Sequence, residues 1–177
     1  IYNQSLVASM IAANGPRATR QWADSFVGNF ARPPQGGDRD QIKAVAAGQC
    51  DVAVANSYYY GKMVGSKKSN EREAAARTAI FWPNQNGRGT HVNISGAAVT
   101  KAAKNRDEAV RLLEFLVNDK SQAWYGEKNF EFPVKAGVAS SAVLKSWGTF
   151  KSDTLNLSAL GKNNPQAVML MDRARWR

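Results

Sequence analysis

Residues 51–63 read DVAVANSYYYGKM and decide how the fold is interpreted. Two valines alternate with small residues at the start of this stretch, which is the pattern of a short β-strand. Tyr58, Tyr59 and Tyr60 follow at the point where the strand is expected to end, and Lys62 comes two residues later. Ligands of open α/β sheets bind beyond the carboxyl ends of the strands. The stretch therefore predicts a strand that leads into a turn from which tyrosine side chains can reach a ligand.

Helical patterns lie on both sides of this stretch. The first two predicted helices are separated by Gly15 and Pro16, which end the first of them. Asp38 or Asp40 is expected to cap the third helix, and Ser121 is expected to cap the sixth. Apolar spacing and composition predict helices over residues 3–14, 18–30, 41–47, 70–77, 107–118, 121–128 and within 140–150 and 167–176. Short apolar runs predict further strands over residues 78–82 and 95–100. This order predicts an α/β fold with a parallel sheet and a helical C-terminal tail.

Composition excludes several kinds of site. The 177 residues include one histidine and one cysteine, so a two-histidine metal site, a structural zinc site and a disulfide framework are excluded. Catalytic motifs such as GxSxG, a P-loop or GxGxxG after a strand are missing, and we expect no enzyme. The single histidine, His91, lies in a glycine-rich stretch and is expected to be a hydrogen-bonded loop residue. The chain opens at IYNQSL and not with a signal peptide, which suggests a processed or truncated N-terminus.

The tyrosine run has two interpretations on the residues alone. Aromatic side chains suit strands, so the tyrosines can simply fill a core and its rim. Alternatively, neighbouring phenols at a strand end can bind a ligand. A phenol has a pKa near 10 and ionises at neutral pH only beside a positive charge. A hard cation such as Fe(III) supplies this charge and prefers anionic oxygen ligands.

The net charge of +10 allows other functions. An oxyanion-binding protein would use the same tyrosines and Lys62 to hydrogen-bond an anion directly. A basic nucleic-acid-binding module would use the charge and the aromatic residues, although the basic residues are scattered and no RNP, KH or zinc-finger pattern is present. The chain can also be a structural or interaction piece. Each of these alternatives stays open at the level of composition.

Four long stretches resemble one known family. They are IYNQSLVASMIAANG at 1–15, GQCDVAVANSYYYGKM at 48–63, GRGTHVNISGAAVTKAAKN at 87–105 and EAVRLLEFLVNDKSQAWYGEKNFEFPV at 108–134. Together and in this order they resemble the periplasmic ferric-iron-binding proteins of ABC importers, in particular the cyanobacterial type. The resemblance implies a two-lobed periplasmic binding protein that captures iron(III) between α/β lobes and delivers it to an ABC permease in the inner membrane. It implies a periplasmic location, and it implies that the protein does not bind nucleic acid.

The resemblance also implies the ligands. Tyr2 matches the tyrosine of the family's first motif, while Tyr58 and Tyr59 match its adjacent tyrosine pair. Tyr60 matches no ligand position and is expected to pack beside the pair. Lys62 stands where many members have arginine, and it is expected to contact an anion or to lie just outside the metal ligands. A synergistic anion or a water molecule would complete the coordination of Fe(III). Lysine keeps the charge of arginine but lacks its bidentate geometry.

The length departs from the family, whose members are roughly twice as long. The resemblance implies that residues 1–87 form most of the second, C-terminal lobe, that residues 88–130 belong to the first lobe, and that residues 131–177 return to the second lobe as a helical tail. The missing N-terminal half would then be a partner of this chain. Three explanations are open: a proteolytic or engineered fragment, a first half that is a separate chain, or a sequence that is given only in part. In an isolated half, iron binding is expected to be weakened.

Overall fold

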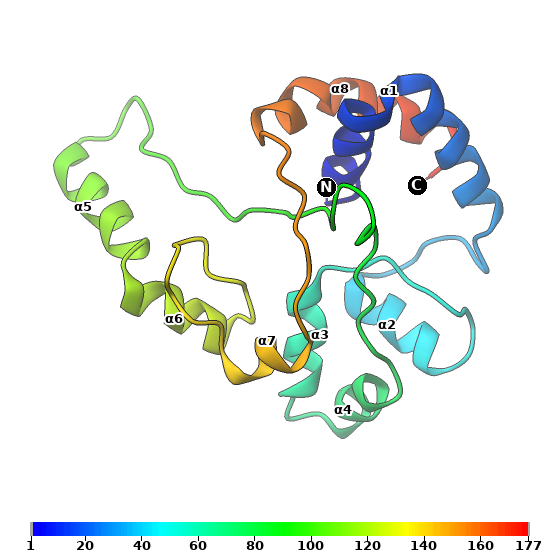
Figure 1. Cartoon of the computed structure of the whole chain (residues 1–177), viewed down its shortest axis with the longest axis horizontal. Helices are drawn as coiled ribbons and strands as arrows, with labels where there is room; N and C mark the ends of the chain where they lie inside the picture. The colour runs from blue at the N-terminus through cyan, green and yellow to red at the C-terminus, as the bar shows by residue number, and fades with distance from the viewer. Residues whose placement is uncertain (1, 177) are drawn as a thin grey trace.

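A computed structural model of the chain describes residues 2–176. Eight helices are present in this part of the chain, and Figure 1 shows that they form separate groups. Helices α1 and α8 lie together, α2, α3 and α4 form a second group, and α5 and α6 extend away from both, with α7 beside α6. The bounds are α1 Tyr2–Gly28, α2 Asp38–Ala46, α3 Ser57–Val64, α4 Ser69–Ala76, α5 Arg106–Leu116, α6 Asp119–Lys128, α7 Ala142–Ser146 and α8 Ser158–Arg173.

The α/β class expected from the sequence is not found in the described residues. Residues 51–56, 78–82 and 95–100, which were predicted to be strands, run as non-helical connections, and no strand is formed between residues 2 and 176. A strand needs a neighbour to accept and donate its backbone hydrogen bonds. Within residues 2–176 no segment pairs with these three, and Val52 and Phe81 are 78% and 84% exposed. The alternation of apolar residues alone therefore does not produce a strand in the described residues.

Helix α1 bends where the sequence predicted that a helix would end. Gly15 has φ 78° and ψ 162°, a conformation that glycine adopts without strain, and Pro16 follows it. The hydroxyl of Thr19 donates to the carbonyl of Gly15 at 2.8 Å, so the first turn after the bend is joined to the residue at the bend. The two predicted helices therefore exist, but they join at a kink and not through a loop.

The helix caps differ from two of the predictions. The N-cap of α2 is Gly37, whose N–H donates to the carboxylate of Asp40 at 2.9 Å, so Asp40 contributes to the cap from the first turn. The N-cap of α6 is Asn118, whose side chain accepts from the N–H of Ser121 at 2.8 Å. Ser121 is therefore not the cap of α6, because the helix begins two residues before it.

Two buried apolar clusters hold the helices together. The larger one joins α1 to α8 and to the C-terminal residues, where Trp176 packs against Trp22, Phe26 and Phe30 with ring centroids 5.0–6.1 Å apart. The smaller one joins α2, α3 and α4 around Met63, which is fully buried. The helices of these two groups thus bury their apolar faces against one another. No helix in the described residues has the length and apolar character needed to cross a bilayer.

Two connections are fastened to each other between these groups. Thr90 donates its N–H to the carbonyl of Lys151 and accepts from the N–H of Asp153, both at 2.8 Å. Gly89 lies against this pairing with φ 97°, and a Cβ there would come within 2.7 Å of the Lys151 carbonyl oxygen. Only glycine fits at this close approach. The pairing is an isolated bridge, and beyond it the chain leads toward α5.

Candidate metal centre

Tyr58 and Tyr59 project from the first turn of α3. Their ring centroids are 4.4 Å apart with an interplanar angle of 35°. The helix can begin here because Asn56 holds an extended conformation at its N-cap, with φ −77° and ψ 133°. The sequence predicted that the tyrosines follow a strand at the mouth of a turn. They lie instead at the start of a helix, but they still share one end of an element and lie side by side.

Tyr2 joins this pair from a distant part of the chain. It begins α1, and the hydroxyl of Tyr58 donates to the hydroxyl oxygen of Tyr2 at 3.0 Å. Tyr2 is 41% exposed, whereas Tyr58 and Tyr59 are half-buried. The structure therefore brings together all three tyrosines that the resemblance singled out, although 56 residues separate Tyr2 from Tyr58.

The surroundings keep the phenol of Tyr58 protonated. Burial raises the pKa of Tyr58 well above its usual value, and hydrogen bonds with Tyr2 and Tyr59 raise that pKa further. Nearby phenols also repel any second negative charge that forms among them. A strongly positive ligand is therefore needed to convert the Tyr58 phenol into a phenolate.

Lys62 lies one turn after Tyr58 on α3. Its Nζ is 5.2 Å from the centroid of the Tyr58 ring, within the range of a cation–π contact. The ammonium group therefore faces the ring of Tyr58. The positive charge stands beside the phenols, where it favours the approach of an anion.

Tyr60 points away from the other tyrosines. Its hydroxyl donates to the carbonyls of Ala75 and Thr78 at 3.3 and 3.1 Å, and its ring meets that of Trp147 at 5.9 Å. It belongs to the side chains packed against the cluster around Met63. Tyr60 therefore has a packing role, as expected, but its ring contact is with Trp147 and not with the tyrosine pair.

A hollow of about 400 Å³ opens beside Tyr2. Its walls are mostly apolar, and the polar residues among them are Tyr2, Ser5 and Asn93. The lining residues are Tyr2, Ser5, Asn93, Ile94, Leu157 and Leu160. Space for a small ligand is thus available next to Tyr2. Elsewhere in residues 2–176, no three His, Cys, Asp or Glu side chains gather as a metal site would need.

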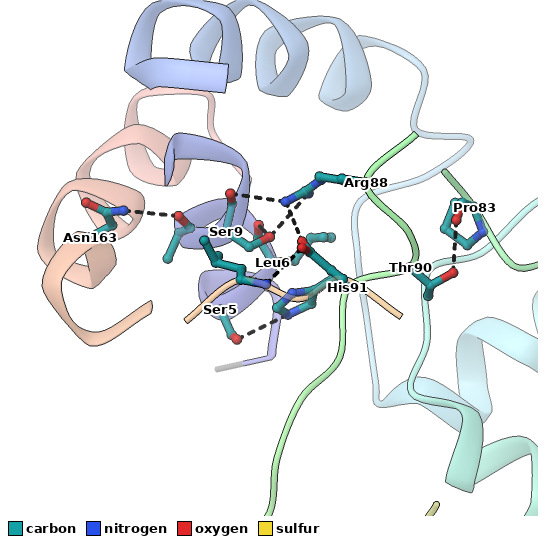
Figure 2. A network of polar contacts seen from close by, with 11 residues as sticks. Ser5, Leu6, Ser9, Pro83, Arg88, Thr90, His91 and Asn163 are labelled. Atoms are coloured by element: carbon teal, nitrogen blue, oxygen red, sulfur yellow. Dashed lines mark hydrogen bonds and ion pairs between the residues drawn. The ribbon is translucent and has the colours of Figure 1, made fainter. Parts of the chain in front are cut away.

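A polar network supports the N-terminal turns of α1 (Figure 2). Arg88 forms an ion pair with Asp153 at 2.8 Å and donates to the carbonyl and the hydroxyl of Ser9 at 3.2 and 3.3 Å. His91 Nε2 lies 3.2 Å from the hydroxyl of Ser5. His91 is thus a hydrogen-bonded loop histidine, as predicted. Burial lowers its pKa, and the charge of Arg88 lowers it further.

Sequence reasoning did not find the residues that surround the phenols. Ser5, Asn56 and Asn93 are short polar residues with no distinctive spacing, and their contacts join segments far apart in the chain. The only local signal was the position of Asn56 immediately before the predicted turn. Such residues become visible only when the segments are placed in space.

Comparison with known proteins identifies the family. Residues 12–123 match the profile of the family described as bacterial extracellular solute-binding protein. The chain belongs to this family. Among curated proteins, it is 47% identical over 176 residues to Iron uptake protein A1 of Synechocystis, a match that covers 99% of this chain and 49% of that protein. Iron uptake protein A2 of the same organism is 47% identical over 178 residues, covering 99% and 51%.

Solved structures of the solute-binding family have the same chain path. A Trichodesmium protein, described as IdiA or FutA in complex with iron and citrate ligands, is 50% identical with a TM-score of 0.96. The ferric binding protein from Campylobacter jejuni is 40% identical with a TM-score of 0.95. Each match covers 99% of this chain and 56% of the solved chain. This solute-binding protein chain therefore spans about half the length of the relatives that it matches.

Proposed function

We propose that this chain is the tyrosine-bearing part of a binding protein that captures iron(III). Tyr2, Tyr58 and Tyr59 would bind the metal as phenolates. The observation that carries the proposal is the 3.0 Å contact between the hydroxyl groups of Tyr2 and Tyr58, beside the ring of Tyr59. Three relatives support it, because Iron uptake proteins A1 and A2 and the iron-bound Trichodesmium protein are named for iron.

Charge balance favours a trivalent cation at this site. Three phenolates carry three negative charges, which would neutralise one Fe(III). The chain as a whole is strongly basic, with a net charge of +10, so its general field does not attract cations. Binding must therefore rely on local anionic oxygens, and phenolate oxygens are hard ligands that suit a hard cation. A divalent metal would supply less charge with which to overcome the raised pKa of Tyr58.

A synergistic anion or a water molecule would complete the coordination. Lys62 supports an anion because its ammonium group lies over the Tyr58 ring and adds a positive charge to an otherwise neutral metal–phenolate set. The hollow beside Tyr2 offers space for such a group. Lys62 would contact the anion directly or lie just outside the metal ligands.

The same proposal places this chain in the periplasm, where it would deliver iron to an ABC permease of the inner membrane. The relatives of this chain are solute-binding and iron-uptake proteins, which supports a transport role and not an enzymatic one. The partner that completes this chain would be the half of its relatives' length that it does not cover, which the resemblance places at the N-terminus. Residues 1–87 and 131–177 would then form the second lobe.

Residues 88–130 would belong to the first lobe. Helix α5 buries none of its residues, and Leu112 and Phe115 are 56% and 58% exposed. An amphipathic helix normally covers its apolar side with another element. The exposed side of α5 is therefore suited to pack against the remaining part of that lobe, while Arg88 and Thr90 attach the beginning of the segment to α1 and to residues 151–153.

The proposed site can be tested by loading the unaltered chain and single tyrosine variants with ferric iron. We expect a visible phenolate-to-iron charge-transfer band, and Tyr58→Phe or Tyr59→Phe to weaken iron binding by more than the ~10–100-fold typical for loss of an outer-shell partner. Tyr60→Phe is the matched control, since it removes a neighbouring phenol whose hydroxyl bonds to Ala75 and Thr78. A band that is absent, or equal losses in all three variants, would contradict the site.

An oxyanion-binding protein is the second candidate. It is favoured by one observation: the ammonium group of Lys62 lies 5.2 Å from the centroid of the Tyr58 ring, so a positive charge and a hydroxyl donor stand together where an anion could bind without metal. Titration with phosphate or sulfate, with and without iron, separates the two functions. Iron-independent anion binding that is lost in Tyr58→Phe would favour this candidate, whereas anion binding that appears only with iron would favour iron capture.

A further inference from the structure

The three phenols come from two groups of helices with separate cores. Tyr2 begins α1, which packs on α8, whereas Tyr58 and Tyr59 begin α3, which packs on α2 and α4. The buried residues of the two cores have no member in common within the described chain. Close packing fixes positions inside each core. It does not by itself fix the distance between the Tyr2 phenol and the Tyr58 and Tyr59 phenols.

The short segment 91–93 makes a polar contact with each group. His91 Nε2 lies 3.2 Å from the hydroxyl of Ser5, one turn after Tyr2 on α1. The side-chain amide of Asn93 donates to the side-chain oxygen of Asn56 at 2.9 Å, two residues before Tyr58. One end of this bridge therefore reaches the turn that carries the first phenol, and the other reaches the start of the helix that carries the pair.

Asn56 gives up a capping bond to take part in this bridge. Asparagine at an N-cap usually accepts from the first N–H groups of its own helix. Here no side-chain cap bond is made, and the Asn56 amide nitrogen donates to Asp38 at 3.1 Å while its backbone N–H donates to the same carboxylate oxygen at 2.7 Å. A carboxylate only accepts, so the amide nitrogen faces Asp38 and the amide oxygen is left for Asn93.

The segment that carries the bridge is itself fastened at its beginning. Thr90 is paired with Lys151 and Asp153, and Arg88 holds both Asp153 and Ser9 (Figure 2). Figure 2 shows His91 following Thr90 on this connection with its ring directed at Ser5. A segment held at its start, with side chains that reach both groups of helices, can act as a spacer between them.

We propose that His91 and Asn93 are positioning residues of the phenol site. Their hydrogen-bond partners are Ser5 and Asn56 and not the three tyrosines. His91 acts through Ser5 on the turn of Tyr2, and Asn93 acts through Asn56 on the start of the Tyr58 and Tyr59 helix. Together they hold the phenols close enough to bind one small cation at the same time. This inference rests on the proposed function, because the spacing matters to iron only if the phenols are its ligands.

The test removes each half of the bridge in turn. Ser5→Ala deletes the partner of His91, and Asn93→Ala deletes the donor to Asn56. For each variant we expect a loss of ferric affinity of ~10–100-fold, as for other residues that orient metal ligands. In the metal-free protein, we expect weaker nuclear Overhauser effects between the ring protons of Tyr2 and Tyr58, while the midpoint of thermal unfolding changes little. Asn29→Ala is the matched control, because it also removes an exposed side-chain hydrogen bond, from the Asn29 amide to the Ser25 carbonyl at 3.1 Å.

The outcomes separate this inference from the proposed function. No ferric band in the unaltered chain would overturn the function itself. A normal band in the unaltered chain, with unchanged affinity and unchanged ring contacts in Ser5→Ala and Asn93→Ala, would overturn only the positioning role. Equal losses of ferric affinity in these variants and in Asn29→Ala would also overturn it, because a general effect of deleting a side-chain hydrogen bond would then explain the result.

Discussion

Helices α1 and α5 are both amphipathic, yet only α1 buries its apolar side. Helix α1 places Val7, Ala8 and Ile11 in a core shared with α8, whereas α5 buries no residue and leaves Phe115 58% exposed. All three proposed ligands start helices that have a buried core. The difference indicates that the site is carried by parts of the chain that pack on themselves. In the arm formed by α5 and α6, the outer helix α5 has no buried residue.

The largest expected effect comes from replacing a tryptophan of the α1 and α8 core, compared with a tryptophan of the arm. Trp176 is 7% exposed and packs against Trp22, Phe26 and Phe30. Trp176→Ala should lower the free energy of unfolding by ~3–5 kcal/mol, the usual cost of removing a large buried ring. Trp124 on α6 is 52% exposed, and Trp124→Ala should cost less than ~1 kcal/mol. Urea unfolding followed by far-UV circular dichroism measures both values.

The comparison fails if the two tryptophan variants lose similar amounts. Equal losses would mean that the arm contributes as much to folding as the α1 and α8 core, and that its exposed apolar residues are covered in solution, for instance by a second copy of the chain. Sedimentation of the unaltered chain would then show association, and Trp124→Ala would reduce it.

A smaller effect is expected where the arm meets α3. Gly61 on α3 faces the side chain of Phe130, and a Cβ at Gly61 would come within 2.5 Å of that ring. Gly61→Ala should destabilise the chain by ~1–3 kcal/mol, because either α3 or Phe130 must shift. Since Gly61 follows Tyr58 and Tyr59 on the same short helix, iron affinity should fall as well. Thermal unfolding and a ferric titration measure the two consequences.

Gly65→Ala is the matched control for this contact. A Cβ at Gly65 would lie 3.5 Å from the far end of the same ring, an ordinary van der Waals distance, and φ is −89°. We expect little change in stability or iron affinity. Similar losses for Gly61→Ala and Gly65→Ala would point to the flexibility of glycine in α3 and not to contact with Phe130.

The helices could be predicted from the sequence, but the strands could not. The spacing of Trp22, Phe26 and Phe30 is a local property, and it correctly predicted a helix that buries one side. Val52 and Val54 have an equally local alternation, but a strand also needs a neighbouring strand, and none lies beside them in the described residues. Local patterns therefore predict helices more reliably, because a helix supplies its own backbone partners.

The candidate site followed the same rule. Tyr58 and Tyr59 were recognised because they are adjacent, and Tyr2 was found only through the family resemblance. Asn93 and Ser5 gave no signal, because each gains its meaning from a contact across more than thirty residues, Asn93 with Asn56 and Ser5 with His91. A fold in space, and not a spacing in the sequence, was needed to find them.

The smallest expected effect is a pH dependence of stability caused by His91, which contacts α1. Burial lowers its pKa below the ordinary value of about 6.5, with Arg88 adding to the decrease and Asn93 and Asp153 opposing it. The unfolded chain therefore binds a proton at a higher pH than the folded chain does. Above pH ~6.5 His91 is neutral in both states, and it contributes no pH dependence.

As the pH falls below about 6.5, the free energy of unfolding should decrease until the folded His91 is also protonated, with a slope of at most ~1.4 kcal/mol per pH unit for one proton. His91→Gln should flatten this part of the profile, and the attribution is clean because the chain has a single histidine. Urea unfolding at intervals between pH 7.5 and 5 checks it. Parallel profiles for both proteins would show that carboxylates, and not His91, cause the loss. A flattened profile would instead show that the bridge beside Ser5 is most stable with a neutral imidazole.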